Sequence, residues 1–298
     1  MADLEKRDWA LLVRRIHEGQ CTPFLGAGAC VGTLPLGGEI AADWARQYDF
    51  PVDEDANNLP RVAQFLALGD PSFPKQEIRA RLAGKGPPDF SAPGEPHAVL
   101  AELGLPVYLT TNYDDFMVQA LRRAGRHPQR DFCRWRGRAD DGPASVFAGP
   151  EGYDPSPATP LVYHLHGLLE ELDSLVLTED DYLDFLVSLS RDQTLVPPRI
   201  QEALAATSLL FVGYQLADWN FRVLFRGLVE TVARSDRLLN VTVQLPRQGD
   251  AEKVRAIHRY LDDYYDEMKV KVYWGDARQF AAELWCNWVA FRDANGGG

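Results

Sequence analysis

The stretch TPFLGAGAC, residues 22–30, decides the fold, because a short apolar run leads directly into a glycine-rich turn. Such a run predicts a buried strand, and the turn at Gly26-Ala27-Gly28 predicts the passage from that strand to a helix. Glycines in this position let backbone amides approach a pyrophosphate closely, although the same turn also occurs in proteins that bind no ligand there. Residues 22–28 are therefore the first predicted strand and a candidate phosphate-binding turn.

The full dinucleotide fingerprint Gly-x-Gly-x-x-Gly is absent, since Val31 stands where its third glycine would be. No acidic residue follows on a second strand about twenty residues further on, where dinucleotide-binding dehydrogenases carry one. The sequence thus argues against an ordinary dehydrogenase.

Beyond this turn, the chain alternates strand-like apolar runs with helical patterns. A helical pattern covers 34–103, interrupted by proline-rich loops at 71–74 and 87–96, and residues 125–160 are predicted to be a loop. The further predicted strands cover 107–111, 161–165, 208–212, 238–245 and 270–274, and the further predicted helices cover 4–19, 116–123, 179–191, 197–206, 218–233, 250–266 and 280–291. This alternation predicts a doubly wound, mostly parallel, Rossmann-like α/β sheet. We expect a single domain over 1–298 with a helical insertion at 34–103.

Polar or glycine-bearing turns follow nearly every predicted strand. In an open α/β sheet the ligand crevice lies at the carboxyl ends of the strands, so we expect these turns to gather around one ligand of nucleotide size. The turns are Gly26-Ala27-Gly28, Asn112, His166-Gly167, Gly213 and Gly275-Asp276.

Two of these turns carry side chains suited to catalysis. Asn112 precedes a predicted helix, so it is either a helix N-cap or a crevice residue, and one role does not exclude the other. His166 precedes a glycine at a strand end, a position suited to a general base because the pKa of imidazole lies near working pH; the alternative is a structural histidine. His164 shares a strand face with His166, but no third ligand lies near them in the sequence, so we predict no metal site.

Other prominent side chains have a structural interpretation. Asp218 and Asn220 follow a predicted strand and are suited to capping the helix after it. We interpret His97 as a packing residue rather than a catalytic one. The numerous aromatic residues over 260–288 are expected in the core or at an oligomer surface.

Composition limits the class of protein. The 298 residues, 46% hydrophobic and 25% charged, are typical of a globular chain. The formal net charge of −12 argues against direct binding of nucleic acid or of an anionic membrane. Four separated cysteines without a Cys-x-x-Cys pair argue against a zinc ribbon and favour a reducing compartment. The first twenty residues contain no apolar signal segment and no apolar run is long enough to span a bilayer, so we expect a cytoplasmic protein.

The order of these motifs resembles that of the sirtuin fold family. The motifs are GAG at 26–28, TNYD at 111–114, HG at 166–167, GYQL at 213–216 and WGDA at 274–277, spread over nearly the whole chain. More narrowly, TTNYD at 110–114 and LTEDDY at 177–182 are similar to the prokaryotic sirtuin-like branch associated with antiphage defence. Members of that branch hydrolyse NAD+ rather than deacylate lysine.

The resemblance implies a role for each motif residue. Asn112 would orient the ribose and the attacking water, and His166 would be the base or a ribose contact. Asp114 would bind the nicotinamide carboxamide, while Gly26, Ala27 and Gly28 would hold the phosphates. Further NAD+ contacts are expected from Cys30, Thr111, Tyr113, Gly213, Tyr214, Gln215, Asp218, Gly275 and Asp276.

The chain departs from the family pattern in three places. Cys30 stands where a serine is usual after the glycine turn, and Gln215 replaces the serine of a later Gly-x-Ser turn. Deacylating sirtuins carry two Cys-x-x-Cys pairs after the His-Gly motif, whereas this chain has no cysteine there before Cys286. The missing zinc cysteines argue against lysine deacylation.

The chemistry of NAD+ cleavage suits such a site. Breaking the nicotinamide–ribose bond passes through an oxocarbenium-like state, as in glycoside hydrolysis, and the leaving group is already a cationic pyridinium. The site must supply geometry, a water molecule and charge stabilisation, which an asparagine and a histidine can provide without a metal cofactor. We therefore expect an NAD+ glycohydrolase that releases nicotinamide and ADP-ribose as the NAD+-depleting effector of bacterial antiphage (abortive infection) defence.

Two other classes remain open. One is a sensor or scaffold that binds NAD+ or ADP-ribose without turnover, and the other is a protein deacylase or ADP-ribosyltransferase. Control by assembly is expected for the hydrolase, because unregulated cleavage would deplete the NAD+ of its own cell. The resemblance implies a homo-oligomer and a defence partner such as a helicase-like ATPase or an Argonaute-type protein.

Overall fold

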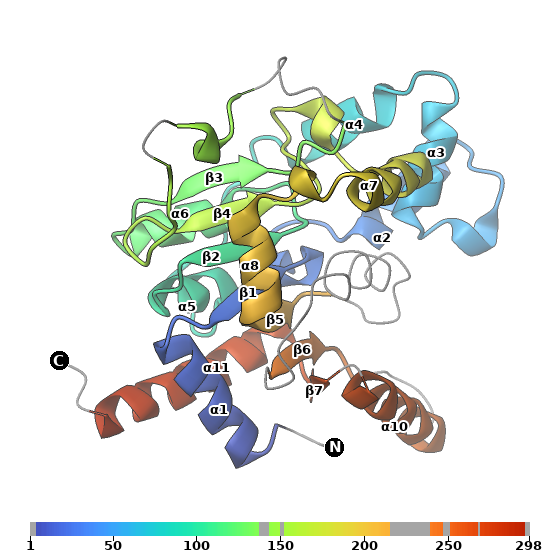
Figure 1. The fold of residues 1–298 in the computed structure, drawn as a ribbon. Helices are drawn as coiled ribbons and strands as arrows, with labels where there is room; N and C mark the ends of the chain where they lie inside the picture. Colours follow the sequence, from blue (N-terminus) through green and yellow to red (C-terminus); the bar gives the residue numbers. More distant parts are fainter. Residues whose placement is uncertain are drawn as a thin grey trace.

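A parallel seven-stranded sheet forms the centre of the protein (Figure 1). The structure is a computed structural model that describes residues 4–136, 143–149, 152–214, 239–246, 251–267 and 269–295. The strand order is β3-β4-β2-β1-β5-β6-β7, and every neighbouring pair is parallel. The predicted doubly wound α/β fold is therefore confirmed.

The elements of the described residues are as follows. The strands are β1 (Cys21–Leu25), β2 (Val107–Thr110), β3 (Gln129–Phe132), β4 (Leu161–His164), β5 (Ser208–Val212), β6 (Asn240–Gln244) and β7 (Val270–Trp274). The α-helices are α1 (Lys6–His17), α2 (Gly37–Gln47), α3 (Leu59–Ala67), α4 (Phe73–Leu82), α5 (Pro96–Glu102), α6 (Phe116–Arg123), α7 (Glu179–Arg191), α8 (Pro198–Ala206), α10 (Ala251–Glu267) and α11 (Ala277–Ala294). Short 3-10 helices cover η1 (Ala27–Cys30), η2 (Asp53–Asp55), η3 (Val146–Ala148), η4 (Leu172–Ser174) and η5 (Gln193–Leu195).

The strand order reverses at β1, which lies between β2 and β5. Leu25, the last residue of β1, pairs with Thr110 of β2 and with Val212 of β5. Thr110 in turn pairs with His164 of β4. The carboxyl ends of four neighbouring strands thus lie side by side at a topological switch point, where open α/β sheets bind their ligands.

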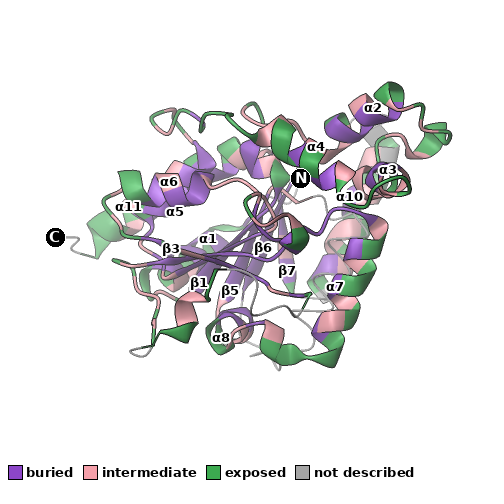
Figure 2. Ribbon diagram, turned by 90° about the horizontal axis from the view of Figure 1, so that it is seen from above, coloured by how far each residue is buried: buried purple, intermediate pink, exposed green. Residues whose placement is uncertain are grey.

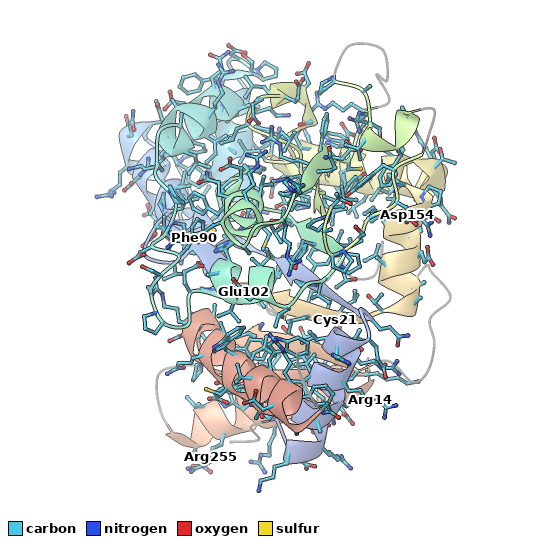
Figure 3. The ribbon with its side chains drawn as sticks, turned by 90° about the vertical axis from the view of Figure 1, so that its left-hand side faces the viewer. Arg14, Cys21, Phe90, Glu102, Asp154 and Arg255 are labelled. Atoms are coloured by element: carbon cyan, nitrogen blue, oxygen red, sulfur yellow. The ribbon has the colours of Figure 1, made fainter. Side chains whose placement is uncertain are left out.

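Helices cover both faces of the sheet, so the strands are buried (Figure 2). On one face, α1, α5, α6 and α11 pack on side chains such as Tyr108 and Leu210. The helices α1 and α11 lie against each other there. Figure 3 shows this contact, with Arg14 of α1 labelled. On the other face, α7, α8 and α10 pack on side chains such as Tyr163 and Phe211. Apolar residues on both sides of each strand are the expected consequence of a parallel sheet between two helix layers.

The helices α2, α3 and α4 build a separate apolar cluster around Trp44, Val62 and Ile78. This cluster also includes Leu175 and Leu177, which lie between β4 and α7. The segment after β4 therefore joins the helical cluster to the sheet. The single-domain division with an insertion at 34–103 stays a prediction, although α5 within that range packs on the sheet.

One predicted loop is partly wrong, because residues 129–132 within the predicted loop 125–160 form the edge strand β3. Its sequence QRDF carries two charged residues and is too short to show alternation, so the pattern gave no strand signal. The predicted helix 218–233, with Gln215, Asp218 and Asn220, lies outside the described residues. Among the described helices, none combines the length and the apolar character needed to cross a bilayer.

Candidate functional site

The glycine turn after β1 packs against the turn after β5. The amides of Gly26 and Gly28 donate hydrogen bonds to the carbonyls of Val212 and Gly213, both over 2.9 Å. Gly213 has φ +86°, and a Cβ there would lie 2.3 Å from the Ala29 nitrogen. The glycines are thus required by a close backbone contact between two loops. Because these two amides are already engaged, the phosphate-binding role of the turn stays a prediction.

Asn112 lies directly beyond β2, against this turn. Its backbone N–H donates to Thr110 Oγ1 (2.9 Å), and its carbonyl accepts from His164 Nδ1 (3.0 Å). Its side-chain Nδ2 donates to the Gly26 carbonyl (3.1 Å) and to Cys30 Sγ (3.4 Å). Among the described residues, none donates to Oδ1, so the side chain retains one acceptor for a ligand.

The N-cap interpretation of Asn112 is wrong. The N-cap position of α6 is Asp115, and Asp114 Oδ1 accepts from the Phe116 amide at the start of that helix. Local capping by Asp114 leaves the Asn112 side chain free to reach across to the glycine turn.

Two buried histidines follow at the carboxyl end of β4. Burial lowers the pKa of His164, and it lowers the pKa of His166 to about 3. The Nε2 atoms of both rings are buried and have no hydrogen-bond partner among the described residues. The expectation that the pKa of His166 lies near working pH therefore does not hold here, and the ring is neutral at pH 7. A neutral buried imidazole with an unpartnered nitrogen is suited to exchanging a hydrogen bond with a ligand.

The loop that carries His166 is held by the chain that follows it. Gly167 has φ +87°, and a Cβ there would lie 2.3 Å from the Ser174 carbonyl oxygen, so only glycine fits. The Val176 amide donates to the His166 carbonyl (3.1 Å). The imidazole ring packs edge-on against Tyr182 of α7, with centroids 5.3 Å apart. Segment 166–178 thus fixes the position of the histidine.

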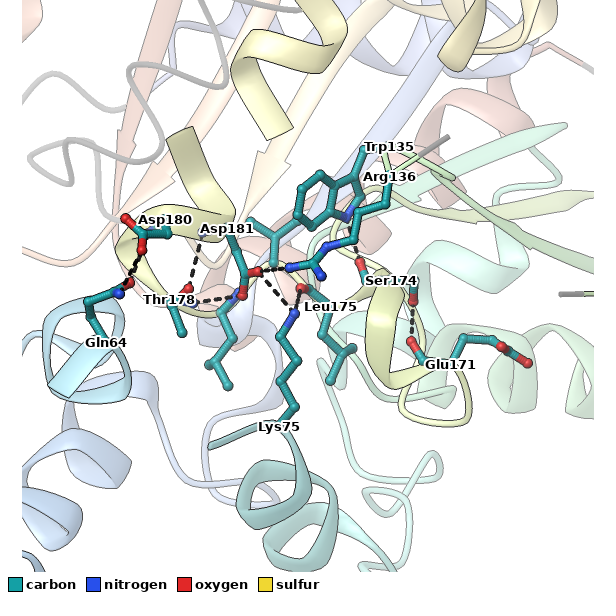
Figure 4. Close-up of polar contacts among 12 residues, drawn as sticks. Gln64, Lys75, Trp135, Arg136, Glu171, Ser174, Leu175, Thr178, Asp180 and Asp181 are labelled. Carbon is teal, nitrogen blue, oxygen red and sulfur yellow. Dashed lines mark hydrogen bonds and ion pairs between the residues drawn. The ribbon is translucent and has the colours of Figure 1, made fainter. Parts of the chain in front are cut away.

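A buried ionic network fixes that segment in turn (Figure 4). Lys75 of α4 donates to the Leu175 carbonyl (2.9 Å) and to Asp181 Oδ1 (3.0 Å). The guanidinium of Arg136 also contacts Asp181 Oδ1 (2.5 Å), and Asp181 Oδ2 accepts from the Leu177 amide (3.1 Å). Burial opposes ionisation of Asp181, but Lys75 and the amides outweigh it and lower its pKa. The LTEDDY motif is therefore the clamp between the helical cluster and the histidine loop.

Three other predicted ligand contacts have internal partners. Thr111 Oγ1 donates to the Tyr214 hydroxyl (2.8 Å), which donates to the Leu25 carbonyl (2.9 Å). Burial raises the pKa of Tyr214 well above its ordinary value. The Tyr113 hydroxyl donates to the Val176 carbonyl (2.6 Å). These hydroxyls join the carboxyl ends of β1, β2 and β5 to one another and to segment 166–178.

Cys30, Glu95, His97 and Asp114 form a buried group that we call the Cys30 cluster. The thiol donates to Asp114 Oδ2 (3.4 Å), and Cys30 Sγ lies 3.9 Å from His97 Nε2. Glu95 Oε1 lies 2.8 Å from His97 Nδ1, with both side chains 1% exposed. Burial, followed by the Asp114 carboxylate, raises the pKa of the Cys30 thiol well above its ordinary value.

The remaining predicted contacts lie apart from this centre or outside the described residues. Gly275 and Asp276 follow β7, which β6 separates from β5. The Asp276 carboxylate accepts from the Gln279 amide (2.8 Å) and so caps α11. Gln215 and Asp218 are not described. The structure therefore brings together the turns of β1, β2, β4 and β5, with the turn of β7 further along the same edge.

Sequence reasoning missed Glu95 and the part played by His97. The two residues flank Pro96 at the start of α5, and their spacing gives no signal by itself. His97 meets Cys30 of η1 only through the tertiary packing of α5, which contacts α6 and α11.

The fold and this arrangement define a Rossmann-like α/β protein with a ligand site at the switch point of its sheet. The chain belongs to the SIR2-like domain family: the profile of that family, described as SIR2-like domain, matches residues 106–266, more than half of the chain. The family expected from the motif order is thereby confirmed.

Three curated relatives are each named NAD(+) hydrolase ThsA. The protein from Cytobacillus dafuensis is 25% identical over 214 residues, which cover 69% of this chain and 37% of that protein. The protein from Acinetobacter baumannii (strain 532279) is 24% identical over 221 residues, covering 70% and 39%. The protein from Enterococcus faecium is 27% identical over 126 residues, covering 42% and 23%. The chain spans about two fifths or less of the length of these relatives.

Among solved structures, a chain described under "Structural Basis for the Mechanism and Regulation of Sir2 Enzymes" aligns with a TM-score of 0.43 and 13% identity. The alignment covers 97% of this chain and 100% of that chain.

Proposed function

We propose that this chain hydrolyses NAD+ to nicotinamide and ADP-ribose. Relatives named NAD(+) hydrolase match over 69% and 70% of the chain. The observation that carries the proposal is a pair of polar atoms without a hydrogen-bond partner in the described part of the chain, Asn112 Oδ1 after β2 and His166 Nε2 after the neighbouring strand β4.

The two side chains have complementary tasks in this proposal. Asn112 is held at its backbone and through Nδ2, so Oδ1 is preorganised to accept a hydrogen bond from the attacking water or a ribose hydroxyl. His166 is neutral, so it contacts the ribose through a hydrogen bond rather than acting as a strong base. The pyridinium leaves without protonation, and positive charge develops on the ribose. Catalysis then depends on geometry and on polar atoms aimed at that charge.

The test is release of nicotinamide and ADP-ribose from NAD+, measured by chromatography. We expect Asn112→Ala and His166→Ala to lower the rate by about 100-fold or more, because each removes a hydrogen bond made to the reacting ribose or water. The exposed residues Asn57 and His127 supply matched controls, Asn57→Ala and His127→Ala, that should keep the wild-type rate. Undiminished cleavage by both site variants would remove the residue assignment.

Binding without turnover is the competing outcome. Calorimetry that finds tight NAD+ binding, with the ligand intact after hours, would identify a sensor instead of an enzyme. Nicotinamide release that requires an added acyl-peptide or protein acceptor would identify a deacylase or transferase. We further propose that the hydrolase acts in antiphage defence and is controlled by assembly with itself or with a partner protein.

A further inference from the structure

We propose that His164 is a positioning residue of the candidate site, which holds the main chain of Asn112 and does not itself touch the ligand. The ring nitrogen Nδ1 of His164 lies 3.0 Å from the Asn112 carbonyl oxygen. This hydrogen bond fixes the backbone of Asn112 and so directs its Oδ1 at the reacting ribose or water. The inference rests on the proposed NAD+ hydrolysis and adds a residue to that same site.

The chain leaves the sheet at Asn112, directly after β2. Pairing of β2 with β4 runs to Thr110 and His164, and the Leu165 amide donates to the Thr110 carbonyl (2.8 Å). Beyond this pair, side chains take over from the backbone. Thr110 Oγ1 accepts from the Asn112 amide (2.9 Å), and the imidazole of His164 occupies the Asn112 carbonyl. The His164 side chain thus replaces the ladder bond that ends with the strand.

His164 is itself a fixed point in the sheet. The residue is 0% exposed and pairs with Thr110 on one side and with Phe132 of β3 on the other. Its carbonyl accepts from the Cys133 amide (2.9 Å). Side chains carried on paired strands are held more precisely than those on loops. The bond to His164 therefore ties Asn112, which lies on a loop, to the rigid part of the molecule.

The hydrogen bond also determines the tautomer of the ring. A carbonyl oxygen only accepts, so Nδ1 of His164 carries the hydrogen and Nε2 carries a lone pair. Burial lowers the pKa of His164, although the Asn112 carbonyl and the Asp114 carboxylate oppose this shift, so the ring is neutral at pH 7. Among the described residues, the ring makes this one hydrogen bond, and Nε2 is buried without a partner.

Packing alone does not account for a histidine at this position. Val162 lies on the same face of β4 and belongs to the apolar core. An apolar side chain at position 164 would continue that face without leaving a buried nitrogen unpaired, which opposes folding. The bond to Asn112 supplies the reason for the histidine, because an apolar residue there has no donor for the carbonyl.

The first experiment measures the tautomer without NAD+, by ¹⁵N nuclear magnetic resonance of protein labelled in its histidines. We expect His164 to be neutral with its hydrogen on Nδ1, whereas Nε2–H predominates in a free histidine side chain. The variant His164→Asn removes its signals and so assigns them. A His164 ring with its hydrogen on Nε2 would overturn the proposal, because the bond to Asn112 would then be absent.

The second experiment compares three replacements of His164 in the nicotinamide-release assay. His164→Asn keeps an N–H donor close to the place of Nδ1, His164→Gln moves the donor toward the place of Nε2, and His164→Leu has none. We expect His164→Asn to keep kcat within about threefold of wild type. The other two should lower kcat by about 10- to 100-fold, with KM within about threefold, because the reacting groups lose their alignment.

A matched control separates positioning from packing. Val162→Ala disturbs the same face of β4 and should keep the wild-type kcat. Circular dichroism and denaturant unfolding establish the folded fraction of each variant, to which its rate is normalised. An active His164→Gln beside an inactive His164→Asn would overturn the proposal, since Nε2 would then be the working atom and His164 a direct ligand contact.

A double variant tests whether His164 acts through Asn112. In the Asn112→Ala background, His164→Leu should cause no further loss of kcat, because the side chain that it positions is already gone. Losses that multiply would show that the two residues act independently and would overturn the proposal. Wild-type protein that releases no nicotinamide would overturn the proposed function and, with it, the role of His164 in catalysis. That result is distinguishable from an active enzyme whose rate does not depend on His164.

Discussion

At the residue scale, the absence of a Cβ atom at three glycines lets the turns after β1 and β5 lie against each other. Gly213 faces Gly26 and Gly28 so closely that a Cβ on any of the three would lie within 3 Å of the opposing loop. The GAG motif therefore has a structural cause that is independent of any ligand. Close approach of the β1 and β5 turns also brings Tyr214 into reach of Thr111, which connects the three strand ends.

Burial of the imidazole of His166 makes stability depend on pH. In the unfolded chain its pKa is 6.5, and in the folded chain burial lowers the pKa to about 3. Between these values the unfolded state binds a proton that the folded state does not, so stability falls as pH decreases from about 6.5. From pH 7.5 to pH 5 this single group costs about 2 kcal/mol.

We predict that His166→Gln reduces the acid loss of stability by about that amount, about 2 kcal/mol between pH 7.5 and pH 5. Chemical denaturation at the two pH values measures the difference. His164 remains buried with a lowered pKa, so part of the acid sensitivity should persist. Replacement of the exposed His127 by Gln is the control and should not change the pH dependence. A variant as acid-sensitive as the wild type would contradict the neutral, buried state of His166.

At the element scale, a buried ion pair contributes to the contact between the helical cluster and α7. The side chains of Lys75 and Asp181 are only 6% and 4% exposed, and Arg136 shares the same carboxylate oxygen. A second pair between the same regions, Arg61 of α3 with Glu179 of α7, is exposed (47% and 39%). The two ion pairs therefore allow the stabilising effect of a buried pair to be compared with that of an exposed pair between the same regions.

We predict that Lys75→Met and Asp181→Asn each lower the free energy of unfolding by about 3–5 kcal/mol, because each leaves a buried partner uncompensated. The double variant Lys75→Met/Asp181→Asn should lose less than the sum of the two single variants, since both buried charges are removed and Arg136 is partly exposed to water. Arg61→Gln should cost less than about 1 kcal/mol. Denaturant unfolding of the four variants measures these values, and additive losses in the double variant would show that the two charges do not stabilise each other.

At the scale of the whole molecule, the elements that could be predicted are those whose ends are marked by local sequence patterns. Helix 179–191 and strands 208–212 and 270–274 match their predicted bounds, because caps and apolar runs mark their ends. The edge strand β3 could not be predicted, because its sequence has no apolar pattern. It is a strand because its backbone pairs with β4, which local sequence does not show. The turns of β1, β2 and β4 were predicted at one edge from topology, whereas the meeting of Cys30 with His97 depends on how α5 packs.

Burial confirms the core position predicted for most of the aromatic carboxyl-terminal residues. Tyr265, Tyr273, Trp274 and Trp288 are all less than 9% exposed and belong to the core. Tyr260 on α10 is 63% exposed, and its ring stacks on Tyr264 with centroids 6.1 Å apart. Among these aromatic residues, exposed Tyr260 makes its face of α10 the candidate for the predicted oligomer surface.

We predict that the chain self-associates through this face and that NAD+ cleavage rises with assembly, because a hydrolase active as a monomer would deplete the NAD+ of its own cell. Mass photometry and the chromatographic assay, run over the same concentration series, test both statements. Tyr260→Ser should shift the dimer or higher oligomer toward monomer and lower the specific activity in parallel. Leu68, 78% exposed at the end of α3, provides the control Leu68→Ser, which removes an apolar side chain elsewhere that is more exposed than Tyr260. Full activity of a chain that remains monomeric at every concentration would contradict both control by self-assembly and activation by a partner protein.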